Sequence, residues 1–172
     1  MRALLDRVFG SAGALAGLFM VGTLLAVLTS IAGRLVPALN LPGVDAYAGY
    51  CTAATAFFAL APTLRRGEHI RVTLLLHRLP AGAQRGLDIA CHVVALFLAG
   101  ALAWFSIRLV LQSHAFNDVS TSLDATPLWI PQLGMAAGTT LFTLAFLGDL
   151  VLLLRGEALR DAQPEGELAR IE

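Results

Sequence analysis

Charged side chains are scarce in this 172-residue sequence: they make up 14% of it, and all twelve basic residues are arginine. A soluble domain usually carries about 25% charged residues, so the deficit excludes an ordinary soluble domain. We interpret the lack of lysine as a composition bias without mechanistic weight. The formal net charge of zero excludes the strongly basic surface typical of nucleic-acid binding, and we expect no nucleic-acid partner.

Cysteine and histidine are too few and too scattered to indicate catalytic or metal chemistry. Cys51 and Cys91 lie inside apolar runs, where a cysteine is usually a small buried hydrophobic residue. Only His92 among the four histidines lies in such a run, whereas haem ligation inside a bilayer needs two facing ligands. The sequence shows no glycine-rich phosphate loop and no nucleophile arrangement. We therefore expect no enzyme, no catalytic residues, no cofactor and no metal ion.

Long apolar segments are what the sequence has in abundance. It is 57% hydrophobic, with a mean hydropathy of +0.73, and a helix needs about 20 apolar residues to cross a bilayer. The pattern predicts an all-α integral membrane protein with a four-helix membrane domain over 1–155 and a mobile cytoplasmic tail over 156–172. The four predicted spans are residues 10–34, 46–64, 88–110 and 127–154.

A basic stretch over residues 65–86 separates the second and third predicted spans. Its apolar positions recur at helical spacing beside arginines, which predicts a short interfacial helix whose arginines reach phosphate headgroups. The same charges could serve only as a topology signal, because moving arginine across a bilayer is costly. The residues that we assign to lipid or partner contacts are Arg65, Arg66, His69 and Arg71.

The distribution of arginine predicts the orientation of the chain. Ten of the twelve arginines fall on one side of the four predicted spans, and only Arg34 and Arg108 fall on the other. The positive-inside rule then places both termini in the cytoplasm. Amphipathic rings favour the membrane interface, and an outer belt is predicted from Tyr47, Tyr50, Trp104 and Trp129.

Small residues indicate where helices approach one another. Two Gly-x-x-x-Gly motifs, Gly13 with Gly17 and Gly134 with Gly138, remove side-chain bulk from a helix face and favour close packing. Thr126 and Pro127 resemble the N-cap and first residue of the last helix. Asp149 lies near the cytoplasmic end of that helix, where its expected role is structural pairing with an arginine.

The basic stretch contains the string Arg65-Arg66-Gly67-Glu68-His69-Ile70-Arg71-Val72, which is followed by Leu79-Pro80 and later by Pro127-x-Trp129. This pattern resembles the DctQ-type small membrane subunit of TRAP (tripartite ATP-independent periplasmic) transporters. The resemblance covers most of the chain. It implies a scaffold, in a bacterial inner membrane, for a large transport subunit that imports a small organic anion with sodium. The implied partners are that large subunit, a periplasmic substrate-binding protein and phospholipid.

Two other functions remain open from the residues. His92 and the four-helix count are compatible with the membrane anchor of a respiratory-type, haem-bearing enzyme complex. The small size of the chain is compatible with an independent exporter. An ionisable residue at mid-membrane depth would favour a transporter core, but such residues are nearly absent from the predicted spans.

Overall fold

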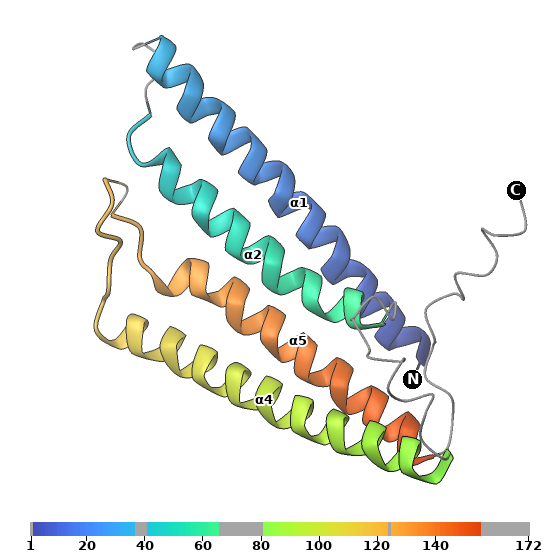
Figure 1. The fold of residues 1–172 in the computed structure, drawn as a ribbon. Helices are drawn as coiled ribbons and strands as arrows, with labels where there is room; N and C mark the ends of the chain where they lie inside the picture. Colours follow the sequence, from blue (N-terminus) through green and yellow to red (C-terminus); the bar gives the residue numbers. More distant parts are fainter. Residues whose placement is uncertain (1, 37–40, 66–80, 124, 156–172) are drawn as a thin grey trace, which may run out of the picture.

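A computed structural model describes residues 2–36, 41–65, 81–123 and 125–155, and their secondary structure is almost entirely helical. Four long helices alternate in direction along the chain, so that α1 begins and α5 ends at the same end of the molecule, and α2 and α5 run parallel to each other (Figure 1). The all-α expectation is confirmed for these residues. The helices are α1 (Arg2–Leu35), α2 (Val44–Arg65), α4 (Ala81–Ala115) and α5 (Trp129–Leu154).

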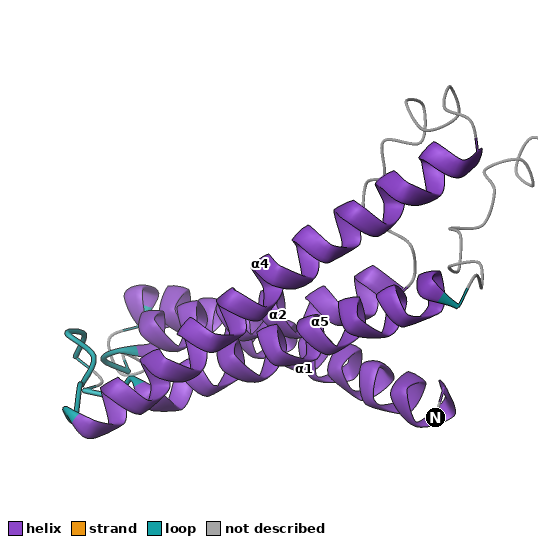
Figure 2. Ribbon diagram, turned by 90° about the horizontal axis from the view of Figure 1, so that it is seen from below, coloured by secondary structure: helices purple, strands orange, loops and turns teal. Residues whose placement is uncertain are grey.

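The helices pack in a row, in the order α1, α2, α5, α4. Helices α2 and α5 form the middle of the row, while α1 and α4 are its two edges. Viewed along another direction, α1 and α4 diverge toward the end at which α1 begins (Figure 2). The described residues therefore form one twisted layer, and most side chains of the edge helices face outward.

The helices are held by narrow stripes of small residues. On α4 the buried positions recur every three or four residues, which is the spacing of a helix seam. They are Ala99, Ala103, Ser106, Val110 and Ser113. Large apolar residues occupy the remaining faces and stay exposed, because a surrounding bilayer is as apolar as a leucine side chain.

Three helices are long and apolar enough to cross a membrane by length and composition: Arg7–Leu35, Arg85–Ala115 and Trp129–Leu154. Helix α2 is not among them, although its 22 residues exceed the 20 or so that a span needs. Tyrosine, threonine and glycine lower its hydropathy. Its place in the row gives α2 protein neighbours on two sides, which reduces the lipid-facing surface that apolar residues must supply.

Polar side chains inside the helices bond to their own backbone. The hydroxyl groups of Thr55, Ser106 and Thr143 each donate to the carbonyl four residues earlier, at 2.7 to 2.9 Å. Thr139 is fully buried and donates in the same way to Met135. Such bonds satisfy a hydroxyl where no water is present, so these residues are compatible with a membrane interior.

The connection between α4 and α5 corrects one sequence-based expectation. Helix α5 begins at Trp129, and its N-cap is Leu128 without a side-chain cap bond. The Thr126 hydroxyl lies 3.0 Å from the Tyr47 hydroxyl, and Pro127 pairs with Val119 in an isolated β-bridge. The prediction of Thr126 as N-cap was wrong, because its side chain is engaged by α2 and its backbone by the connecting loop.

Candidate functional site

The closest contact between helices joins the two middle members of the row. A Cβ atom placed on Gly138 of α5 would lie 2.5 Å from the Phe57 carbonyl carbon of α2 and 2.6 Å from its oxygen. One turn away, a Cβ on Gly134 would lie 3.3 Å from the Ala54 Cβ atom. The two glycines singled out in the sequence therefore lie at the α2–α5 seam, where the backbones nearly touch.

The α1–α2 seam includes only one of the two glycines that the sequence suggested, and a further glycine that it did not. A Cβ on Gly22 would lie 3.3 Å from the Cys51 sulfur, and one on Gly13 would make ordinary contact with the Pro62 ring at 3.7 Å. A Cβ on Gly17 would meet no atom of the described residues within 4 Å. Of the first Gly-x-x-x-Gly motif, Gly13 alone faces the neighbouring helix.

We name the end at which α1 ends and α5 begins the Trp129 end. The four aromatic residues predicted as a belt lie on helix segments near this end. Tyr47 and Tyr50 pack edge to face, with ring centroids 5.8 Å apart, and Trp129 packs against His114 at 5.4 Å. Trp104 is 63% exposed. Trp129 thus also joins α5 to α4, and Tyr47, through its hydroxyl, joins α2 to the loop before α5.

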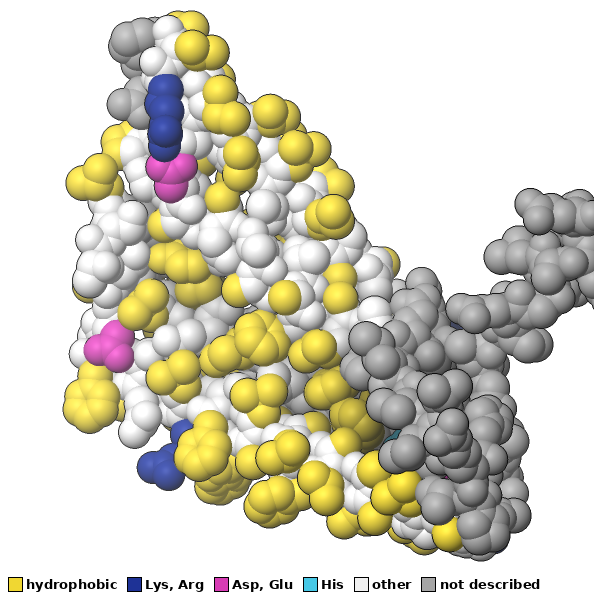
Figure 3. Space-filling view, in the orientation of Figure 1, with side chains coloured by type: hydrophobic (Ala, Val, Ile, Leu, Met, Phe, Trp, Pro, Cys, Tyr) yellow, Lys and Arg dark blue, Asp and Glu magenta, His cyan; other side chains and the backbone are white. Residues whose placement is uncertain are grey.

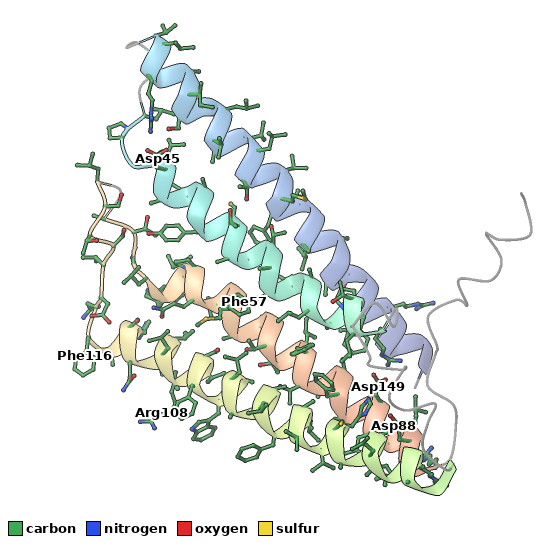
Figure 4. The ribbon with its side chains drawn as sticks, viewed as in Figure 1. Asp45, Phe57, Asp88, Arg108, Phe116 and Asp149 are labelled. Carbon is green, nitrogen blue, oxygen red and sulfur yellow. The ribbon has the colours of Figure 1, made fainter. Side chains whose placement is uncertain are left out.

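A charged pair at the Trp129 end was not foreseen. Arg34, near the end of α1, lies 3.7 Å from the Asp45 carboxylate at the start of α2, and Ser30 donates a hydrogen bond of 2.5 Å to that carboxylate. Both charged side chains are more than 70% exposed, so their contribution to stability is about 0 to 1 kcal/mol. The pair links the end of α1 to the start of α2, where Figure 4 labels Asp45.

We name the opposite end of the row the Arg65 end. The Arg65 guanidinium lies 4.8 Å above the centre of the Phe9 ring of α1, and one of its nitrogens would lie 3.9 Å from a Cβ on Gly148 of α5. The next residue of α5, Asp149, is buried, with 6% exposure. Arg65 of α2 therefore contacts α1 and lies close to the segment of α5 that carries Asp149, which Figure 4 labels near this end. The other predicted contact residues, Arg66, His69 and Arg71, lie outside the described residues.

The two described histidines do not face each other. His92 lies 2.8 Å from the backbone oxygen of Asp88 through Nδ1 and packs against Phe146, whereas His114 lies 22 residues further along the same helix. That separation is about 33 Å along a helix. Within the described part of the chain, no group of three or more histidine, cysteine, aspartate or glutamate side chains could hold a metal ion.

The described surface is dominated by exposed apolar side chains. On the face shown in Figure 3 the charged side chains are few and lie toward the Trp129 end. On α4 the exposed residues include Phe97, Leu98 and Phe105, each more than 60% exposed. A water-soluble monomer rarely exposes apolar patches of this extent. The fold and its surface therefore define a small multi-pass membrane protein.

Residues 23–156 match a family described as "Tripartite ATP-independent periplasmic transporters, DctQ component". The match spans more than three quarters of the 172 residues, and the chain belongs to this family. It is a DctQ-type small membrane subunit of a TRAP transporter, as the residues of the basic stretch predicted. No individual curated protein is matched. The family is a transporter component and not an enzyme.

Proposed function

We propose that this subunit is a static scaffold that supports a large transport subunit in the membrane. The single-layer arrangement of its helices carries this proposal. A layer has no interior that could enclose a transport path, whereas its broad apolar faces suit contact with lipid on one side and with another membrane protein on the other. The absence of charged side chains at mid-depth of the described helices agrees with a role outside the substrate path.

We further propose that all four helices span the membrane, α2 included. Charged residues bracket two of the helices at the same interval: Asp45 and Arg65 in α2, Asp88 and Arg108 in α4. Each pair is 20 residues apart, which corresponds to about 30 Å of helix and to the thickness of the hydrocarbon core. In α5, Trp129 and Asp149 have the same separation. These equal intervals support the proposal that the hydrocarbon core of the membrane begins and ends at the same two levels in α2, α4 and α5.

The orientation follows from the arginines. The Arg65 end is the cytoplasmic one in this proposal, because the positive-inside rule keeps the end richer in arginine on that side. The Trp129 end, with its aromatic rings and only Arg34 and Arg108, then faces the periplasm of a bacterial inner membrane. Both chain termini are cytoplasmic under this arrangement.

Membership of the family supports the proposed partners and transport reaction. The large membrane subunit would carry the substrate, and a periplasmic binding protein would deliver it at the Trp129 end. A sodium gradient would drive the uptake of a small organic anion. The substrate itself would be determined by those two proteins.

The scaffold proposal is tested by the fate of the large subunit. A C-terminal tag on this chain should recover a large multi-span protein at about one to one from native membranes in mild detergent. Deleting the gene for this chain while keeping the large subunit should abolish solute uptake and lower the amount of large subunit in the membrane. Full uptake by the large subunit without this chain would contradict the proposal.

The orientation predicts which cysteines a membrane-impermeant maleimide can reach. In a chain with Cys51 and Cys91 replaced by serine, Ser122→Cys should be labelled in intact spheroplasts. Ala83→Cys should be labelled only after the membrane is opened. Both positions are exposed, so a difference in labelling reports sidedness. Labelling of Ala83→Cys in intact spheroplasts would reverse the proposed orientation.

A further inference from the structure

A recess of about 250 Å³ lies between α1 and α2, near the Arg65 end. It forms because α1 has almost no side-chain bulk where it passes the Pro62 ring. The residues of α1 that line it are mostly glycine and alanine, and Phe9 lines the part nearest the Arg65 end. Its walls are Phe9, Gly10, Gly13, Ala14, Ala16, Ala59, Pro62 and Thr63.

An arginine stands at the mouth of this recess. Arg7, Gly10 and Ala14 recur at i, i+3 and i+7, so that they lie on one face of α1. Arg7 is exposed and precedes Gly10 by one helical turn, on the side nearer the Arg65 end. Among the residues that the structure describes, no acidic side chain pairs with Arg7. This face of α1 thus carries an exposed arginine one turn before an apolar hollow.

We propose that this recess binds an anionic phospholipid, with one acyl chain lying in the hollow and the phosphate beside Arg7. The arrangement follows the order of a lipid molecule, in which the charge lies at the interface and the chain runs inward from it. An arginine at this level can reach the headgroups. The inference goes beyond scaffolding. It rests on the proposed function only in one respect, because the proposed orientation decides which leaflet of the bilayer supplies the lipid.

The shape of the recess separates this site from general lipid contact. An annular lipid meets a convex helix surface, whereas here the missing side chains of α1 leave a hollow against a proline ring. Pro62 within α2 also removes one backbone donor. The hollow is therefore formed by residues of the α1–α2 pair itself. The Arg65 guanidinium stacks on Phe9, so it lies at the same end of the recess as Arg7.

Two matched substitutions on α1 test the proposal. Gly10 lines the recess, whereas Gly17 lies two turns further along the same face and does not. A Cβ at either glycine meets no atom within 4 Å, so leucine at either position adds the same bulk without a backbone clash. Gly10→Leu would fill the hollow, and Gly17→Leu controls for added hydrophobicity and helix propensity.

The measurement is the melting temperature of the purified, delipidated full chain in detergent micelles, titrated with phosphatidylglycerol or with phosphatidylcholine. A ligand that binds the folded state raises the melting temperature with its concentration. We expect a larger rise with phosphatidylglycerol than with phosphatidylcholine for the wild type and for Gly17→Leu. For Gly10→Leu that rise should be lost.

A second pair of variants tests the charge and does not depend on the first. Arg7→Gln should lower the preference for phosphatidylglycerol by about fivefold, the effect of one arginine near a headgroup. Arg108→Gln at the other end of the row should leave it unchanged. Equal responses to the two lipids in the wild type, or an undiminished response in Gly10→Leu, would overturn the proposal.

The result is independent of the scaffold test. Micelles have no sidedness and the isolated chain has no partner, so the lipid measurement can succeed where co-purification fails, and the reverse. If the recess instead receives a segment of the large subunit, Gly10→Leu will lose the co-purified partner while the wild-type chain shows no lipid preference. That combination would replace the lipid by a protein occupant.

Discussion

Replacing Gly138 by leucine should prevent the chain from reaching a stable folded state. A side chain at this position meets the Phe57 backbone at 2.5 Å, and backbone atoms cannot rotate away as the end of a side chain can. Helices α2 and α5 would have to separate along the seam that joins the two halves of the row. We expect a loss of about 3 kcal/mol or more, measured by thermal unfolding in micelles.

Gly148→Ala is the matched control for this prediction. It lies on the same helix, and its Cβ would make only an ordinary contact of 3.9 Å with Arg65. We expect a change within about 0.5 kcal/mol. A Gly138→Leu chain that unfolds at the wild-type temperature would show that the two backbones are further apart in the membrane than the structure has them.

Replacing Arg65 by leucine should have the second largest effect. The guanidinium stacks on Phe9 and lies close to Gly148 of α5, the residue before the buried Asp149, so its removal loses a cation–π contact and a positive charge beside the segment of α5 that carries a buried carboxylate. Such losses amount to about 2 to 4 kcal/mol in a desolvated setting. The readout is again the unfolding temperature, with Arg85→Gln as an exposed arginine control.

A double substitution distinguishes a charge effect from lost packing. If the cost comes from the carboxylate, Arg65→Leu combined with Asp149→Leu should recover much of the stability, because replacing both charges of a buried pair by apolar groups is often neutral. If the cost comes from the stacking on Phe9, the double variant will be at least as unstable as the single one. The second outcome would contradict electrostatic coupling between α2 and α5 at this end.

The helices themselves could be predicted because each is a long apolar segment with charged residues near its ends, and both features can be identified in the sequence. The order of packing could not. In a water-soluble helix the buried face is the apolar one, but here both faces are apolar, and the seams are marked by small residues instead. Small residues also occur where no helix is near, as Gly17 shows, so a Gly-x-x-x-Gly motif alone does not identify a contact.

The interactions at the two ends depend on residues far apart in the sequence. Tyr47 meets Thr126 across 79 residues, and this contact displaced the expected helix cap. Arg65 ends α2, but the sequence suggested an outward role for it, and its contacts with Phe9 and α5 could not be foreseen. The sequence predicted at which end of the helices these residues lie, but the residues that they contact could be seen only in the packed structure.

The row of helices also bears on how the chain is assembled during synthesis. Each edge helix packs chiefly on the helix to which a connection joins it, so α1 with α2 and α4 with α5 are two hairpins that can each enter the bilayer as a unit. Formation of tertiary structure then reduces to one lateral association of preformed hairpins, in keeping with membrane proteins that insert first and pack afterwards. The close approach of Gly138 to Phe57 lies on that association surface. The packing of α2 against α5 therefore determines whether the two hairpins associate into one folded subunit.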